Sequence, residues 1–271
     1  MMFPSTDGGV YPEVLSFGGG VQSSVLALMA CKGEIHVDAV IFCDTGSESA
    51  STYETVEFVK AECEKASIPF WIAYADVVLS PFGAVEKVKG YMPLHEWYQS
   101  NGLLPMVRIP RCTFNWKIYP FRRMIVEKFK RKEKPYAAAW LGITTDESHR
   151  ARDSEIQYVT NRFPLIDMGM SRAMCIKWLA DNYPEHTFSK SGCFMCMYQS
   201  PKGWMALKKN NPDLFNIALE MERAAKENGV KAGLWAGRSI EAFNYDSTLA
   251  DYGFEFQPQD FDCNAGGGCF L

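Results

Sequence analysis

Three consecutive glycines followed by two hydroxyl side chains lie in the stretch Val14–Ala30, VLSFGGGVQSSVLALMA. Glycine reaches backbone angles that are closed to other residues and leaves room for a ligand against the main chain. The N–H groups of such a turn and the positive end of a following helix dipole suit a phosphate or sulfate. Ser23 and Ser24 are expected to cap that helix. The candidate contacts are Ser16, Gly18, Gly19, Gly20, Gln22, Ser23 and Ser24.

Five of the nine cysteines form a second group because they lie among glycines, polar residues and turns. An odd number of cysteines in an apparently cytosolic chain argues against a disulfide framework and for metal or redox chemistry. The other four, in apolar or helical surroundings, are expected to be buried thiols: Cys31, Cys43, Cys63 and Cys175. The five to explain are Cys112, Cys193, Cys196, Cys263 and Cys269.

These groups need a scaffold that brings distant loops together. The runs Val37–Phe42 and Pro69–Ala75 are typical of buried strands, and a helix is expected between them over Thr52–Lys65. Alternating strands and helices predict an α/β fold with a doubly wound, mainly parallel sheet, whose ligands bind at the carboxyl ends of the strands. Asp44 and Thr45 lie at such an end, beside the glycine loop if the two strands pair.

Composition limits the kind of protein. The chain has 271 residues, 47% of them hydrophobic, and a formal net charge of −4, which argues against a free-standing, strongly basic binder of duplex nucleic acid. No apolar run approaches the roughly 20 residues that a membrane span requires, and the N-terminus lacks the basic and apolar regions of a signal peptide. We therefore expect no membrane partner and a cytoplasmic location.

The glycine loop resembles the SGGxDS signature of the PP-loop family, the ATP pyrophosphatases and their relatives the phosphoadenylylsulfate and adenylylsulfate reductases. Gly19, Gly20 and Ser23 match it, whereas Gly18 stands at its first serine and Gln22 at its aspartate. The resemblance implies an adenine nucleotide alpha hydrolase-like fold that binds ATP or adenylylsulfate. Magnesium is a further candidate, although glutamine is a poor ligand for a hard cation.

Two further segments resemble motifs of the same family. Asp44, Thr45 and Gly46 resemble its DTG motif, which implies contacts with the adenosine. The segment 142–152, GITTDESHRAR, resembles its GIRxxES-type segment, in which acidic and arginine residues close over the nucleotide. The resemblance makes Arg150 and Arg152 candidates for binding the phosphate or sulfate. It makes Asp146 and Glu147 candidates for binding magnesium or a ribose hydroxyl.

The segment 111–120, RCTFNWKIYP, resembles the family's CCxxRKxxP segment. Cys112, Lys117 and Pro120 match it, and Thr113 and Trp116 replace its second cysteine and its arginine. Lys117 is therefore a candidate catalytic residue.

In iron–sulfur adenylylsulfate reductases that cysteine pair and a later CxxC hold a [4Fe-4S] cluster. The resemblance implies that Cys112, Cys193 and Cys196 supply three ligands here, with Cys263 as the fourth. Cys269 as the fourth ligand, an open iron position and a tetrahedral zinc ion are the alternatives.

Positive charge is concentrated in a helix expected over Pro120–Lys134. A solvated face is the usual interpretation of such a run, but any contact with a tRNA or DNA acceptor should fall here. A sulfur-donor protein such as a cysteine desulfurase is a second candidate partner. The basic residues are Arg122, Arg123, Lys128, Lys130, Arg131, Lys132 and Lys134.

The chain divides by these motifs into residues 1–185, a PP-loop nucleotide-binding domain, and residues 186–271, a C-terminal helical extension with the CxxC and terminal cysteines. Helices are expected from a Ser171 cap to Asn182 and over Pro212–Asn228. Four prolines interrupt the stretch 80–110, which is expected to be irregular, either a lid over the site or a surface excursion.

Two enzymatic mechanisms fit the resemblance. In the first, an acceptor is adenylated by ATP, and sulfur held by the cluster or by a terminal cysteine then displaces AMP. In the second, Cys263 or Cys269 attacks the sulfur of adenylylsulfate or its 3′-phosphate to give a thiosulfonate, on the way to sulfite release. The altered cysteine pair favours the thiolation class, and a nucleotide-binding subunit without catalysis is a third alternative.

Overall fold

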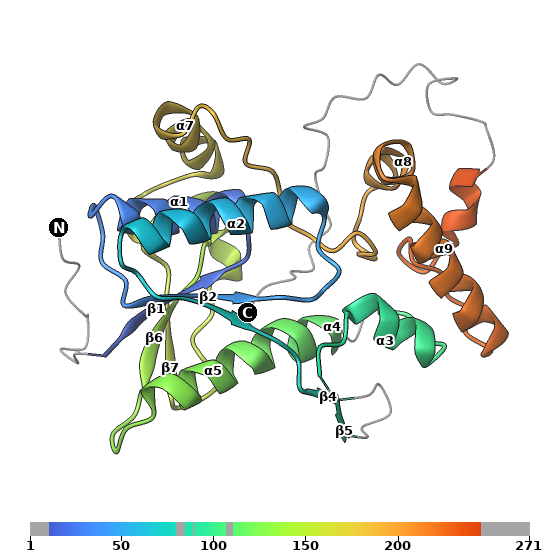
Figure 1. Ribbon diagram of the computed structural model, residues 1–271, viewed down its shortest axis with the longest axis horizontal. Coiled ribbons are helices and arrows are strands. Elements are labelled where there is room, and N and C mark those ends of the chain that lie inside the picture. The colour runs from blue at the N-terminus through green and yellow to red at the C-terminus, as the bar shows by residue number, and fades with distance from the viewer. Residues whose placement is uncertain (1–10, 80–84, 89, 107–110, 245–271) are drawn as a thin grey trace.

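Five parallel strands form the central sheet of the computed structural model, which describes residues 11–79, 85–88, 90–106 and 111–244. Their order is β3-β2-β1-β6-β7, so the first strand lies in the middle of the sheet (Figure 1). The doubly wound, mainly parallel α/β fold predicted from the sequence is confirmed. The strands are β1 (Glu13–Phe17), β2 (Ala39–Cys43), β3 (Phe70–Ala73), β6 (Ala137–Trp140) and β7 (Val159–Arg162).

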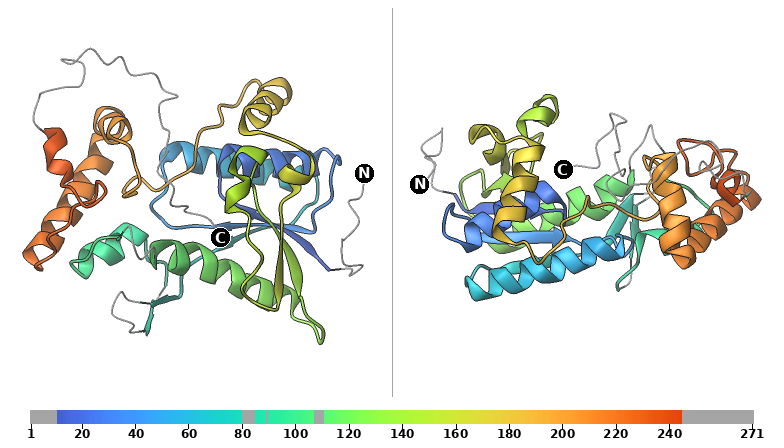
Figure 2. Two further views of the ribbon diagram at one scale, coloured as in Figure 1. Left: turned by 180° about the vertical axis from the view of Figure 1, so that it is seen from behind. Right: turned by 90° about the horizontal axis from the view of Figure 1, so that it is seen from above.

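Helices cover both faces of the sheet. Three of them, α1, α2 and α7, lie on one face and α5 lies on the other (Figures 1 and 2). Both faces of β2 are therefore buried, which explains why this strand is a continuous apolar run. The bounds are α1 (Val21–Cys31), α2 (Ala50–Lys65), α5 (Tyr119–Phe129) and α7 (Arg172–Asn182).

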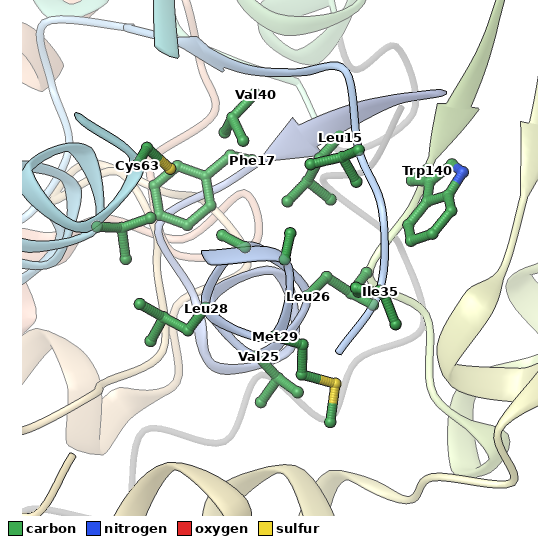
Figure 3. Packing of buried hydrophobic residues seen from close by; sticks show 14 of the residues in the cluster. Leu15, Phe17, Val25, Leu26, Leu28, Met29, Ile35, Val40, Cys63 and Trp140 are labelled. Carbon is green, nitrogen blue, oxygen red and sulfur yellow. The ribbon is translucent and has the colours of Figure 1, made fainter. Parts of the chain in front are cut away.

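The largest apolar cluster lies between the sheet and α1. Leu15 and Val40 from the strands pack against Leu26 and Leu28 of the helix, and each of the four side chains is fully buried (Figure 3). Burial of one such side chain contributes about 1.5–3 kcal/mol, so this cluster fixes where α1 begins relative to the end of β1.

A second apolar cluster joins segments that are distant in the sequence. Trp97 and Trp116 pack in it with Phe194, Trp204 and Phe215 from the C-terminal part of the chain. The helix α9 lies beside α3, and α8 lies beside α9, at one end of the molecule (Figures 1 and 2). The elements involved are α3 (Leu94–Ser100), α4 (Arg111–Thr113), the π-helical turn η1 (Phe114–Ile118), α8 (Pro201–Asn210), α9 (Pro212–Glu227) and the 3-10 turn η3 (Ile240–Asn244).

Several expected element bounds are corrected. The stretch 80–110 contains α3, which begins directly after its cap Pro93, because a proline before the first turn removes no helical hydrogen bond. Residue 130 takes an extended conformation, so the basic helix ends at Phe129. The α7 helix starts as expected, with Ser171 Oγ accepting from the Met174 N–H. The remaining elements are β4 (Val77–Leu79), β5 (Val85–Lys87), α6 (Pro164–Asp167) and the 3-10 turn η2 (Thr145–Arg150).

The division at residue 185 stays a prediction. In the part of the chain that is described, no helix combines the length and the apolar content that crossing a membrane requires.

A buried carboxylate holds the loop after α9. Glu222, fully buried, accepts from the N–H groups of Leu234 at 3.0 Å and Ile240 at 3.1 Å. We expect Glu222→Ala to lower the free energy of unfolding by about 3 kcal/mol, because two buried N–H groups lose their acceptor. Urea denaturation measures this, with Glu220→Ala on the exposed face of α9 as the control. Equal unfolding midpoints for the two variants would contradict it.

Candidate functional site

The glycine loop connects β1 directly to α1. The helix begins at Val21 with Gly20 as its N-cap, so Ser23 lies inside the first turn and the expected serine cap is wrong. Glycine is a tolerated N-cap residue. Ser23 Oγ instead accepts from the Gly18 N–H and donates to the Gly20 carbonyl, both at 3.2 Å, and thereby fixes the loop. Gly19 has φ +70°, and a Cβ there would lie 2.7 Å from Thr52 Cγ2.

The two other loop residues predicted to bind the anion differ in position. Ser16 is a half-buried residue of β1, and Ser24 is fully buried in α1.

The end of β6 presses on the same loop. A Cβ on Gly142 would lie 2.9 Å from the Ser23 backbone nitrogen and 3.2 Å from the Gln22 carbonyl carbon. These contacts are with main-chain atoms, which cannot rotate away as the end of a side chain can. The GITT segment and the glycine loop are therefore packed together at the carboxyl edge of the sheet.

Asp44 follows β2, and its carboxylate is already hydrogen-bonded. Oδ1 accepts from the Gly46 N–H and the Tyr53 hydroxyl, each at 2.8 Å, and Oδ2 accepts from the Tyr91 hydroxyl at 3.1 Å. Burial and the nearby Asp44 charge raise the pKa of both tyrosines, so they stay protonated and keep donating. The carboxylate thus orders this turn, and a nucleotide would meet its backbone and the residues around it.

The segment before α3 covers the same turn. The Leu94 N–H donates to the Thr45 carbonyl at 2.8 Å, and the His95 N–H donates to Ser47 Oγ at 3.0 Å. Gly46 permits the approach, since a Cβ at its φ of +65° would lie 2.9 Å from Pro93 Cα. Part of the stretch predicted to be irregular therefore lies over the end of β2.

Glu48 connects the turn to the CxxC segment. Its Oε1 accepts from Thr45 Oγ1 at 3.1 Å, pairs with Lys117 Nζ at 3.0 Å, and lies 3.5 Å from Cys193 Sγ. The side chain is fully buried, which makes this carboxylate dependent on its partners. Sequence reasoning assigned Lys117 and Cys193 to separate roles and did not indicate Glu48. Its signal was an acidic side chain three residues after Thr45, beside a buried strand end.

The CxxC segment itself lies at the carboxyl ends of the strands. Gly192 accepts from the Ser49 N–H and the Phe194 N–H donates to Ser47, each at 3.0 Å. A Cβ on Gly20 would lie 2.8 Å from Ser191 Oγ, so the residue two positions before the first CxxC cysteine touches the glycine loop. The segment around the first CxxC cysteine therefore packs against both the glycine loop and the turn after β2.

A polar network joins the glycine loop to η2 and α7. Gln22 Nε2 donates to Glu147 Oε2 and Gln22 Oε1 accepts from Arg172 Nη1, both at 3.1 Å. Arg150 Nη1 pairs with Glu147 Oε1 at 2.7 Å, and Asp146 Oδ1 accepts from the Arg172 N–H at 3.0 Å. Arg172 was missed by sequence reasoning, because nothing in the helix Arg172–Asn182 indicates that its first residue faces Gln22.

Arg152 does not take part in the contacts described for this network. Its side chain is exposed, and Nη1 donates to the carbonyl of Ala151.

The cysteines are only partly brought together. Cys193 and Cys196 share one turn, and Cys112 packs against the same apolar cluster as Cys193. Within the described ranges, no three or more His, Cys, Asp or Glu side chains are close enough to hold a metal ion. The described residues thus do not assemble a cluster site, and Cys263 and Cys269 lie outside the described residues.

The four cysteines expected to be buried thiols are almost all enclosed. Cys43, Cys63 and Cys175 are buried, and burial raises the pKa of Cys43 to about 12. Cys31 is half-buried, with Sγ 3.7 Å from Cys63 Sγ.

The basic helix is partly neutralised by neighbours. Arg123 Nη1 pairs with Asp76 at 2.9 Å, and Lys128 pairs with Glu127 at 3.0 Å while its Nζ lies 5.6 Å from the Trp71 ring centroid. Neighbouring carboxylates therefore account for these two cations.

Comparison with known proteins identifies the family of the N-terminal part of the chain. A family model described as the phosphoadenosine phosphosulfate reductase domain matches residues 12–170. An uncharacterised protein of Methanocaldococcus jannaschii is 25% identical in an alignment of 233 residues that covers 83% of this chain and 51% of that protein. The chain therefore spans about half the length of this curated relative.

Proposed function

Because the chain belongs to the phosphoadenosine phosphosulfate reductase domain family, we propose that it is a sulfur-transferring enzyme that binds an adenine nucleotide across the carboxyl ends of β1, β2 and β6. The family is one of nucleotide-binding, sulfur-handling enzymes. Gly18 to Gly20 would bind the phosphate or sulfate end, and the turn after β2 would contact the adenosine.

One observation carries the sulfur part of the proposal. Cys193 Sγ lies 3.5 Å from Thr45 Oγ1 at the end of β2, and Ser191 of the same segment touches Gly20. A thiol is therefore held at the strand edge where the family binds its nucleotide. Lys117 reaches this thiol's neighbour Glu48 and brings a positive charge to the edge.

ATP-dependent adenylation and thiolation of an acceptor is the first candidate reaction. The acceptor class, a small molecule or a tRNA or DNA bound through α5, remains a proposal, as does a sulfur-donor protein such as a cysteine desulfurase. A [4Fe-4S] cluster bound by Cys112, Cys193, Cys196 and Cys263 belongs to this candidate. Because the described residues do not form the cluster site, we assign it no step.

Reduction of adenylylsulfate or its 3′-phosphate to sulfite is the second candidate, favoured by Gln22. In place of the aspartate of the PP-loop signature, this amide is bonded to Glu147 and Arg172. A thiol would attack the sulfur to form a thiosulfonate, and the nucleotide phosphate would leave. A second thiol would then attack the first thiol's sulfur, which releases sulfite and leaves a disulfide. Arginine rather than a metal ion would then face the leaving group.

Two product assays separate the candidates. Pyrophosphate release from ATP is measured with tRNA, DNA and small-molecule acceptors, and sulfite release is measured from adenylylsulfate and its 3′-phosphate. Release of either product identifies the reaction. Nucleotide binding with neither product would contradict an enzymatic role and would indicate a nucleotide-binding subunit.

Metal content tests the cluster. Anaerobically purified protein is expected to contain about four iron and four sulfide per chain if the cluster is present, with absorption in the visible range that disappears on chelation. The Cys193→Ser variant should lose both. Stoichiometric zinc in a colourless protein would contradict the cluster and would indicate the tetrahedral zinc site instead.

A further inference from the structure

Position 22 is where the glycine loop departs from the pattern of ATP-cleaving enzymes, and the structure gives the glutamine a specific task. A carboxamide can donate to a carboxylate with its nitrogen and accept from a guanidinium with its oxygen. Gln22 does both, with 3.1 Å contacts to Glu147 Oε2 and to Arg172 Nη1. An aspartate or glutamate at position 22 would repel Glu147.

The acidic residues that could hold magnesium are engaged by the same network. Glu147 Oε1 pairs with Arg150 at 2.7 Å and Oε2 accepts from Gln22, so both oxygens have a donor. Asp146 Oδ1 accepts from the backbone N–H of Arg172 at 3.0 Å. A divalent cation would have to displace these donors, and magnesium demands near-ideal octahedral oxygen geometry. The carboxylate oxygens of Glu147 and Asp146 are therefore arranged to bind the two arginines rather than a magnesium ion.

Arg172 is well placed to bind an anion. It is the first residue of α7, and Gln22, its partner, lies two residues after Gly20 on α1. A guanidinium carries five N–H donors, and the Gln22 contact occupies only one nitrogen. Gln22 thus orients the planar, permanently charged guanidinium of Arg172 beside the start of α1, the helix that follows the glycine loop.

We infer that Arg172, oriented by Gln22, neutralises the phosphate or sulfate end of the bound nucleotide, and that nucleotide binding requires no divalent cation. This assignment rests on the proposed nucleotide site. It adds Arg172 as a binding residue of that site and states that binding does not depend on a metal ion. Arg150, held by Glu147, supplies the second cation of the site.

Calorimetric titration with ADP and with adenylylsulfate, in excess magnesium and in EDTA, tests the inference on the full chain. For the unaltered protein we expect dissociation constants in the two conditions that agree within about threefold. For Arg172→Gln we expect the dissociation constant in EDTA to rise by about tenfold or more, since a charge-assisted contact is lost. Lys177→Gln, an exposed change on the same helix, is the matched control and should leave affinity unchanged.

Gln22→Glu adds a readout that a structural role would not move. It places a second carboxylate beside Glu147, and we expect binding to become about fivefold or more tighter with magnesium than in EDTA. Equal affinities for Gln22→Glu in the two conditions would count against the assignment of Gln22.

Two further outcomes are distinguishable. Binding by the unaltered protein only with magnesium would overturn the inference and leave the proposed nucleotide site standing. Failure of both nucleotides to bind in either condition would overturn the proposed function together with the inference.

Discussion

The Gly142→Ala variant is expected to bind nucleotide with a dissociation constant about tenfold or more higher. Its free energy of unfolding is expected to fall by about 2 kcal/mol. The added Cβ would lie 2.9 Å from the Ser23 nitrogen and 3.2 Å from the Gln22 carbonyl carbon. Because both are main-chain atoms, the start of α1 must move. That movement distorts the N–H groups that are proposed to hold the phosphate.

Gly192→Ala is the matched control for this change. A Cβ at Gly192 meets nothing within 4 Å, although the residue lies in the segment that covers the site. Titration with ADP measures the affinity of both variants, and urea denaturation measures their stability. Unchanged affinity in Gly142→Ala would show that the glycine loop is not where the nucleotide binds.

Removal of the Glu48 carboxylate is expected to have the second large effect. Glu48→Ala should lower the free energy of unfolding by about 3 kcal/mol, because Lys117 loses a partner 3.0 Å away in a buried environment. The segment with Cys193 also loses one of its contacts to the turn after β2. Faster hydrogen exchange at the Phe194 amide, which donates to Ser47, would report that release.

Glu57→Ala is the control for Glu48→Ala. Glu57 lies in α2, the helix that follows the turn with Glu48. Its side chain is 70% exposed, and its 3.9 Å pair with Lys60 is a surface contact. Such pairs contribute about 0–1 kcal/mol. A Glu48→Ala protein as stable as Glu57→Ala would contradict the assignment of Glu48 as the connection between the turn and the CxxC segment.

Local patterns were sufficient to predict the scaffold. The apolar runs that became β2 and β3 are each short, and a helix was expected between them, so the alternating pattern of a parallel sheet could be predicted. The Ser171 cap of α7 was also a local signal, and the structure has it. Local signals misled at Gly20, because a glycine can cap a helix as the predicted serine would, and at Pro93, where a proline starts a helix.

Contacts between distant segments could not be predicted in the same way. The Gln22 side chain meets Arg172 across 150 positions, and Glu48 meets Cys193 across 145. Each pair depends on how α7 and the CxxC segment pack on the sheet, which no periodicity in the sequence encodes. The hydrophobic partners were equally hidden, since Trp97 and Phe194 join one cluster only after the chain has folded.

A crystal structure with bound ADP or adenylylsulfate tests the central claim most directly. The account predicts that the phosphate or sulfate oxygens lie within hydrogen-bonding distance of the N–H groups of Gly19 and Gly20 and of the Arg172 guanidinium, with the adenosine over the turn after β2. A nucleotide bound elsewhere on the chain, or no bound nucleotide at saturating concentration, would contradict it.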